Sequence, residues 1–176
     1  MLKSPLFRVS LRYGVIAGLL CTGSVISLFY MGKHPFLINP FVDFRVPVFA
    51  LLLFFCLKEI RDFYQGGVLY FWQGTGGSMI FLVAASAVAA GGIFLFGNWQ
   101  PAFLTEYITV FMNQIRNLPP ETVDRIGKSV VEQNLKALPS TTMGNLASLY
   151  AWQSMVNGHF ISVIISIILR RQPKIE

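Results

Sequence analysis

Four long apolar stretches, separated by shorter polar segments, dominate the sequence. They cover about residues 13–30, 41–62, 69–96 and 143–169. A helix rises about 1.5 Å per residue, so roughly 20 apolar residues cross the ~30 Å hydrocarbon layer of a membrane. We therefore predict an all-α integral membrane protein with four transmembrane helices, folded as a single domain over residues 1–176.

The second stretch carries the weakest signal of the four. Its uninterrupted apolar part, residues 46–57, covers about 18 Å as a helix, which is less than the membrane thickness. It crosses only if the helix extends outward past Asp43 and Arg45 and inward past Lys58. The long side chains of Arg45 and Lys58 keep their charges at the membrane surface. Asp43 and Arg45 are two residues apart and do not face each other on a helix, so we expect both to meet water or lipid headgroups.

The segment between the third and fourth stretches, about residues 100–142, has a different pattern. Apolar residues recur there with helical spacing, at Leu104, Ile108, Phe111, Ile115 and Leu118. The pair Pro119-Pro120 then breaks the chain, and proline is favoured at the start of a new helix. We predict two amphipathic helices outside the hydrocarbon, which lie on the membrane surface or fold over the transmembrane helices.

The composition agrees with a chain that has lipid as its main solvent. Hydrophobic residues make up 54% of the sequence and charged residues 12%, about half the share of a soluble domain. The net charge of +6 comes largely from basic residues beside the apolar stretches, a pattern that marks one side of a membrane and argues against nucleic-acid binding. Cys21 and Cys56 have no metal-ligand spacing, and no catalytic set stands out, so we expect no cofactor, no metal and no enzymatic activity.

A charged turn follows the second stretch, with the sequence Lys58-Glu59-Ile60-Arg61-Asp62-Phe63-Tyr64-Gln65-Gly66-Gly67. Lys58 and Asp62 are four residues apart and can pair on one helix face. One interpretation is a docking site for a cytoplasmic partner or a lipid headgroup. The other, which we favour, is a charged helix end that anchors the helix at the interface and stops at a Gly-Gly turn.

Several residues in and after this turn follow a family pattern: Lys58-Glu59, Arg61-Asp62, Gly66-Gly67, Phe71, Gln73 and Gly74. The closing segment, residues 158–166 followed by Arg170-Arg171, does the same. With these motifs the chain resembles a small bacterial family of four-helix membrane proteins described only as domain of unknown function 4199. The resemblance implies four transmembrane helices and residence in the inner membrane, and it implies no activity. His159 departs from the pattern, which has an apolar residue there.

Small and polar residues form a stripe in the fourth stretch, at Ser154, Gly158, Ser162 and Ser166, with Asn157 and His159 beside it. His159 lies about 15 Å from Arg170 along a helix, near the middle of a membrane. An ionisable residue at that depth is a candidate for function as a proton or ligand site. Alternatively, a neutral His159 hydrogen-bonds to a neighbouring helix as part of a packing surface. The candidate polar site therefore comprises Ser154, Asn157, His159 and Ser162.

Small residues in two further stretches predict where helices pack closely. A Gly-x-x-x-Gly pattern in the first stretch consists of Gly14, Gly18 and Thr22, and the third stretch contributes Ala85, Ala89 and Gly92. In lipid, small residues let helix backbones approach each other closely. We expect these faces to contact other helices, and they also offer a surface for self-association or for a partner protein.

Two functions from different classes fit these patterns. The abundant packing surface and the lack of converging polar groups favour an accessory or structural protein that packs against a membrane partner. The alternative is a small transporter, channel or lipid-handling protein whose pathway runs along the stripe around His159. That alternative requires self-association, because four helices alone rarely enclose a pore.

The distribution of basic residues predicts the orientation of the chain. With both termini in the cytoplasm, that side holds Lys3, Arg8, Arg12, Lys58, Arg61, Arg170, Arg171 and Lys174. The opposite short loop holds only Lys33 and Arg45, and the four basic residues of 100–142 are accompanied by four acidic ones. Because charges in short loops dominate orientation, we expect cytoplasmic termini and an extracytoplasmic segment 100–142.

A reporter enzyme that is active only outside the cytoplasm tests this orientation. Fused after Lys174 it should be silent, and inserted near Ser129 it should be active, because only the second position is expected outside. Reporter activity in living cells is the measurement. The opposite pattern would show that the charges of the short loops assign the two sides incorrectly.

Overall fold

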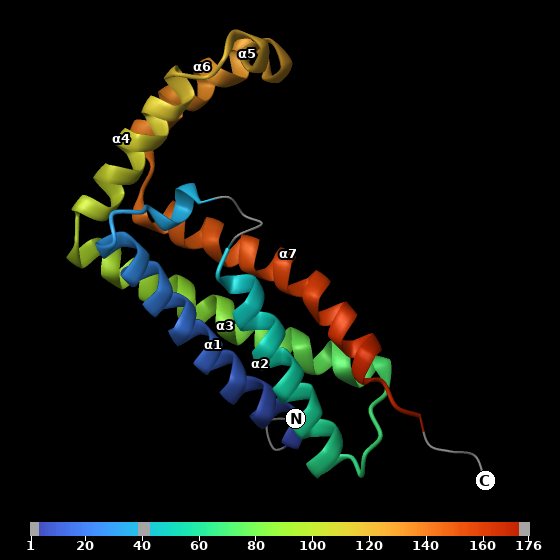
Figure 1. The fold of residues 1–176 in the computed structure, drawn as a ribbon. Helices are drawn as coiled ribbons and strands as arrows, with labels where there is room; N and C mark the ends of the chain where they lie inside the picture. Colours follow the sequence, from blue (N-terminus) through green and yellow to red (C-terminus); the bar gives the residue numbers. More distant parts are fainter. Residues whose placement is uncertain (1–3, 39–42, 173–176) are drawn as a thin grey trace.

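The computed structural model describes residues 4–38 and 43–172, and it is all-α throughout them, as predicted (Figure 1). Its helices are α1 (Pro5–Tyr30), α2 (Arg45–Glu59), α3 (Phe71–Trp99), α4 (Ala102–Arg116), α5 (Pro120–Ile126), α6 (Lys128–Ala137) and α7 (Met143–Leu169). Short 3-10 turns, η1 (Pro35–Leu37) and η4 (Leu138–Ser140), and a π-helical segment, η3 (Ile60–Tyr64), complete this part. Within the described residues, one antiparallel bridge joins Leu69 to Arg171.

Three of the helices, α1, α3 and α7, are long and apolar enough to cross a membrane. The sequence predicted four such helices, and the fourth is not confirmed. The α-helical part of α2 has 15 residues, which cover only about 22 Å. The π-helical segment η3 continues it to Tyr64. Residues 41 and 42, at the start of the predicted second stretch, lie outside the described residues, as do Lys3 and Lys174.

Polar side chains set where the long helices begin. The backbone N–H of Phe7 donates to the Ser4 hydroxyl oxygen at 3.3 Å, and Pro5 occupies the first position of α1. Both features favour a helix start, so α1 begins well before the predicted residue 13. Thr142 caps α7 in the same way, because its hydroxyl oxygen accepts from the backbone N–H of Asn145 at 3.3 Å.

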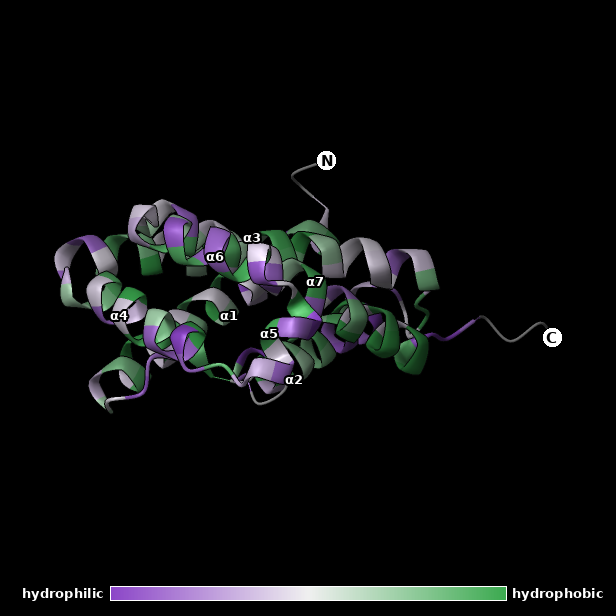
Figure 2. Cartoon of the chain, turned by 90° about the horizontal axis from the view of Figure 1, so that it is seen from above, coloured by the Kyte–Doolittle hydropathy of each residue, from purple (hydrophilic) through white to green (hydrophobic). Residues whose placement is uncertain are grey.

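The four helices α1, α2, α3 and α7 pack together and form what we call the main body (Figure 1). Both α1 and α7 pack against α3, and α2 packs mainly against α1 and α7. Hydrophobic residues recur along these helices (Figure 2). Some of them lie on the outside, where Leu19, Leu95 and Ile168 are mostly exposed. Such an apolar exterior is typical of a surface that meets lipid. The start of α1 and the end of α7 lie at the same end of the main body (Figure 1).

The contact between α1 and α3 is the closest in the main body. A Cβ added at Gly14 or Gly18 would lie 2.6 or 2.7 Å from a backbone oxygen of α3, which leaves no space for a side chain. On α3, a Cβ at Gly92 would lie 2.6 Å from the side chain of Thr22. Two predicted interhelical faces are thereby confirmed: Gly14, Gly18 and Thr22 on α1, and Ala85, Ala89 and Gly92 on α3.

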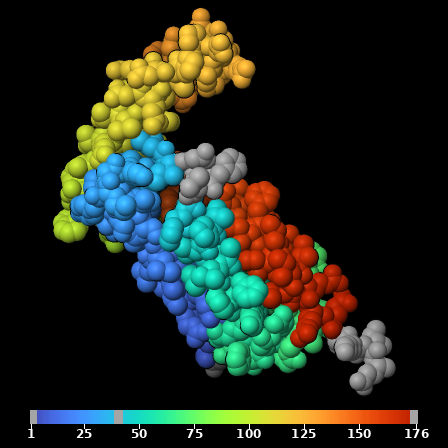
Figure 3. Space-filling view, viewed as in Figure 1, coloured from blue at the N-terminus to red at the C-terminus, as the bar shows by residue number. Residues whose placement is uncertain are grey.

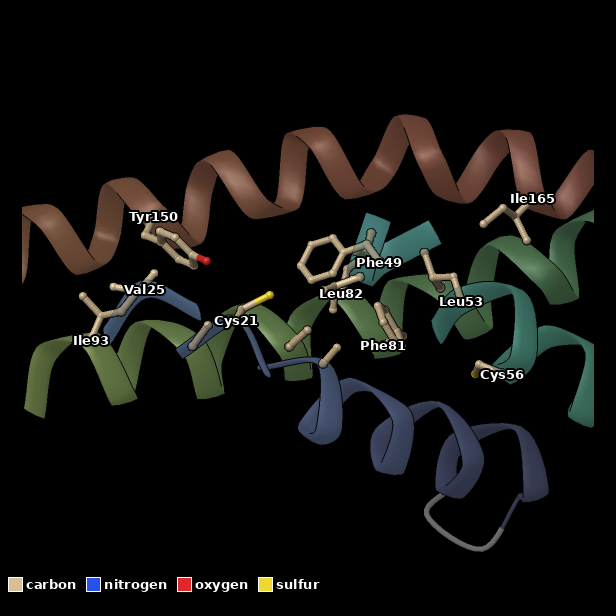
Figure 4. Close-up of a cluster of buried hydrophobic side chains, with 14 of the residues drawn as sticks. Cys21, Val25, Phe49, Leu53, Cys56, Phe81, Leu82, Ile93, Tyr150 and Ile165 are labelled. Atoms are coloured by element: carbon tan, nitrogen blue, oxygen red, sulfur yellow. The ribbon is translucent and has the colours of Figure 1, made fainter. Parts of the chain in front are cut away.

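Large side chains fill the centre of the main body (Figure 4). The rings of Phe49 on α2 and Phe81 on α3 meet edge to face, with centroids 5.8 Å apart. Gly158 of α7 gives room to this layer, because a Cβ there would collide with the side chain of Leu82. The stripe of small residues on α7 therefore serves close packing against α3 and α2.

The helices α4, α5 and α6 form an arm, residues 102–137, that projects from the end of the main body opposite the two termini (Figures 1 and 3). Pro120 begins α5, as predicted. The prediction of two helices is wrong, because Gly127 separates α5 from α6. Its φ of +96° is a conformation that glycine adopts without steric cost. Phe103 and Tyr107 are buried at the base of the arm, whereas no residue of 108–137 is buried.

Replacing Gly18 with alanine should destabilise the main body by roughly 1–3 kcal/mol, the usual cost of overpacking. The added methyl group would press on the backbone of α3 and push α1 away. Gly23→Ala, on the same helix, is the matched control, because a Cβ there meets nothing within 4 Å. Thermal unfolding in detergent micelles measures both variants. Equal unfolding midpoints would contradict the close contact between α1 and α3.

Candidate functional site

Arg45, the first residue of α2, is the most deeply buried charged side chain in the described part of the chain. It is only 4% exposed. The expectation that it meets water or headgroups is therefore wrong. A buried guanidinium is costly unless its donors find partners, so the groups around Arg45 decide whether this arrangement is stable.

Asp43 lies just before α2 and folds back onto Arg45. The backbone N–H of Arg45 donates to Oδ1 of Asp43 at 2.9 Å, and the side-chain Nε donates to Oδ2 at 2.7 Å. Nη2 of Arg45 contacts the same Oδ2. We expected that the two side chains would not face each other. That expectation holds for two residues inside one helix, but Asp43 lies before the helix starts. Its carboxylate turns back to the N–H of Arg45, the first residue of α2.

The other donors of Arg45 reach α7. Nη1 donates to the carbonyl oxygen of Tyr150 and to Oγ of Ser154, each at 3.2 Å, and Nη2 donates to Oε1 of Gln153 at 3.0 Å. The guanidinium carbon also lies 4.2 Å from the centre of the Tyr150 ring, a cation–π contact. The Asp43–Arg45 pair thus connects the start of α2 to α7 with its charge balanced and its donors satisfied.

A pocket of about 840 Å³ opens beside this ion pair, between α1 and the start of α2. Its wall comes mainly from the second half of α1, including Leu20 and Leu28. Lys33, which follows α1, and the Asp43–Arg45 pair supply the charged groups of the lining. An apolar wall with charged groups where α1 ends and α2 begins is suited to an amphiphilic molecule rather than to a fully polar one.

The polar stripe of α7 is divided between two faces of the helix. Ser154, Gly158, Ser162 and Ser166 are all buried. Ser162 satisfies its hydroxyl by donating to the carbonyl oxygen of His159 at 2.8 Å. His159 itself is exposed on the outer face of α7, and Asn157 is half-buried. The serines and the glycine therefore form the packing surface, and the imidazole of His159 takes no part in it.

The charged turn after α2 joins several segments at the end of the main body that holds both termini. Nη2 of Arg12 donates to the two carboxylate oxygens of Glu59 at 2.7 and 2.8 Å, and the Tyr13 hydroxyl donates to Glu59 at 2.9 Å. These contacts tie α2 to α1. The predicted Gly-Gly turn is confirmed, because Gly66 and Gly67 have φ values of +59° and +84°.

The predicted pair between Lys58 and Asp62 does not form. Asp62 instead accepts from Nε of its neighbour Arg61 at 2.7 Å. The spacing of four residues brings side chains together in an α-helix, but η3 is π-helical over Ile60–Tyr64 and has a wider turn. The charged turn thus contributes structural contacts, and its role as a docking site stays a prediction.

His34 forms a second polar centre, at the base of the arm. The residue is buried, and its Nε2 lies 3.0 Å from the carbonyl oxygen of Phe103. Its ring centre is 4.7 Å from that of Phe103 and 5.4 Å from that of Tyr107. Burial lowers the pKa of His34 below its ordinary value, so the neutral ring is the form that fits this aromatic cluster. His34 thereby connects the segment after α1 to α4.

Sequence reasoning missed both buried centres. For Arg45 a signal existed, since an ionisable residue at the edge of a possible transmembrane helix often has a polar partner inside the protein. Its partners on α7 are more than a hundred residues away, and the sequence offers no way to pair them. For His34, no local pattern in the sequence indicated that the side chain would be buried. Within residues 4–38 and 43–172, no three His, Cys, Asp or Glu side chains gather as metal ligands would.

The all-α fold and its three long apolar helices indicate the class of helical membrane proteins. A family model described as "Protein of unknown function (DUF4199)" matches residues 12–171, and the chain belongs to this family. No curated protein and no solved structure matches the chain. The resemblance noted in the charged turn and the last helix is thus confirmed, and it carries no assigned activity.

Replacing Arg45 with methionine should lower the free energy of unfolding by about 3 kcal/mol, near the lower end for a broken buried ion pair. The lower end applies because the Asp43 side chain is 19% exposed and keeps some contact with water. Arg12→Met is the matched control, since Arg12 is 58% exposed in its pair with Glu59 and should lose about 1 kcal/mol or less. Thermal unfolding in detergent compares the two. Similar losses would mean that burial of Arg45 adds nothing.

Proposed function

We propose that the chain is a multi-pass protein of the bacterial inner membrane, with four transmembrane helices and both termini in the cytoplasm. Support for a fourth span comes from η3, which extends α2 to Tyr64, so that the combined helix has about 20 residues, close to the number that crosses a membrane. Support for the orientation comes from the common end of α1 and α7 and from the basic residues that gather there.

We further propose that the protein is an accessory or structural subunit whose arm binds a partner protein. The carrying observation is that three helices form over most of residues 108–137 although none of these residues is buried. Short helices are marginal in water unless an apolar face packs against something. On the arm, Ile126 and Val130 are 47% and 43% exposed, and a shallow groove between α4 and the other two helices includes Phe111 and Leu118.

The charge of the arm favours a protein over the membrane surface as its partner. Helices that bind anionic lipid surfaces are rich in Lys and Arg. The arm instead balances its basic residues with acidic ones: Arg116, Arg125, Lys128 and Lys136 against Glu106, Glu121, Asp124 and Glu132. A surface with mixed charges and a few exposed apolar residues is typical of a protein interface.

The contacts of the small-residue faces also favour the arm as the surface that binds a partner. We expected them to serve a partner or a second copy as well as neighbouring helices. Gly14, Gly18 and Gly92 are occupied within the chain, and so is Gly158 of α7. The arm, in which no residue of 108–137 is buried, is a surface that these contacts within the chain leave free. The transport alternative receives less support, because neither His159 nor the buried serines line the pocket beside Arg45.

A photocrosslinking amino acid placed at Val130 should form an adduct with one other protein in cells. The same amino acid at Ile164, an exposed residue of α7, should not, because that face is expected to meet lipid. Val130→Glu combined with a crosslinker at Ile126 should lose the adduct, whereas Ser129→Glu should keep it. Denaturing gels and mass spectrometry identify the product. A product of two copies of this chain, or none, would contradict the proposed partner.

A further inference from the structure

The pocket beside the Asp43–Arg45 pair has the length of one membrane leaflet. Its wall on α1 runs from Leu19 to Met31, which is about 18 Å along the helix axis. One leaflet contributes about half of the ~30 Å hydrocarbon layer. The volume of about 840 Å³ is also within the usual range for a pocket that holds an organic ligand. An acyl chain that lies along α1 therefore fits this pocket in length and in volume.

The wall of the pocket is suited to hydrocarbon. The hydroxyl of Ser24 donates to the carbonyl oxygen of Leu20 at 2.8 Å, so it has no need of a ligand. Gly23 leaves an open surface, because a Cβ there would meet nothing within 4 Å. Leu19 and Leu20 are exposed, which makes the wall continuous with the apolar outside of α1. A lipid chain could enter sideways from the membrane without passing a polar barrier.

The charged lining points to an anionic headgroup. Asp43 neutralises the charge of Arg45, and acceptors on α7 take up its remaining hydrogen-bond donors. Arg45 therefore closes one side of the pocket and offers little net charge to a ligand. Lys33 also lines the pocket, is exposed, and forms no ion pair with any described residue. Its ammonium group follows the end of α1, at the level where lipid headgroups lie.

We propose that this pocket binds one acyl chain of an anionic phospholipid, with the chain along α1 and the phosphate beside Lys33. The proposal rests on the membrane embedding proposed above and does not depend on a partner for the arm. It gives the Asp43–Arg45 pair a second role, as the polar side of a lipid site.

Purified protein in phosphatidylcholine vesicles is the starting point of the test. The vesicles contain a minor fraction of phosphatidylglycerol that carries a photoactivatable diazirine in its acyl chain. After illumination and digestion, mass spectrometry should locate the adducts mainly on α1 between Leu19 and Met31. Unlabelled phosphatidylglycerol should suppress them at lower concentration than added phosphatidylcholine does.

Two pairs of variants separate a site from ordinary lipid contact. Gly23→Phe places a ring in the pocket and should reduce labelling of α1 several-fold. Gly91→Phe adds the same ring at an equally open position of α3 and should not. Lys33→Gln should weaken suppression by phosphatidylglycerol about fivefold, the effect expected of one basic side chain near an anionic headgroup. Lys58→Gln, at the other end of the main body, should leave suppression unchanged.

Adducts spread evenly over the outer faces of α1, α3 and α7, or labelling unchanged in Gly23→Phe, would overturn the site. Equal suppression by both lipids would overturn its preference for an anionic headgroup. No adduct on any helix would overturn the membrane embedding itself. None of these results bears on the crosslinks of the arm, so the two proposals fail separately.

Discussion

Where α1 crosses α3, Gly14 and Gly18 of α1 lie directly against the backbone of α3, with no side chain between the two helices. The rest of the main body depends on this contact. In lipid, apolar side chains gain little by moving from the surrounding hydrocarbon into a helix interface, so association relies on close van der Waals packing. Gly14 and Gly18 permit that approach. With α3 held against α1, another face of α3 receives α7, whose Gly158 and Ser166 lie close to α3.

Polar contacts then fix α2 at both ends, by different physical means. At one end, Glu59 pairs with Arg12 near the surface, where water and salt weaken the attraction. At the other, Arg45 is buried and depends on Asp43 and α7 for every donor, so it tolerates no loss of a partner. Because Arg45 adjoins the pocket on α1, the same contacts that hold α2 in place also shape the proposed lipid site.

The main body and the arm have surfaces suited to different surroundings. The main body exposes leucine, isoleucine and phenylalanine to its surroundings, whereas the arm carries balanced charges and a few apolar side chains. The join between them is the aromatic cluster around His34 and Phe103, the last buried layer before the arm projects away. A partner held by the arm would thus sit at the membrane side opposite the termini, above a lipid site that opens into the adjacent leaflet.

The sequence by itself determined the features that depend on neighbouring residues. Hydropathy and helical spacing predicted the all-α class and the three long apolar helices. Glycine and proline predicted the Gly66-Gly67 turn and the start of α5 at Pro120. Small-residue spacing also predicted the interhelical faces of α1 and α3. Only the tertiary structure decided the candidate site, because Arg45 meets partners from α7 that no local pattern connects to it. For the same reason His159, prominent in the sequence, lies on the outer face while the unremarked His34 is buried. Periodicity shows that a helix has two faces, and the packing of distant helices decides which face each residue finally occupies.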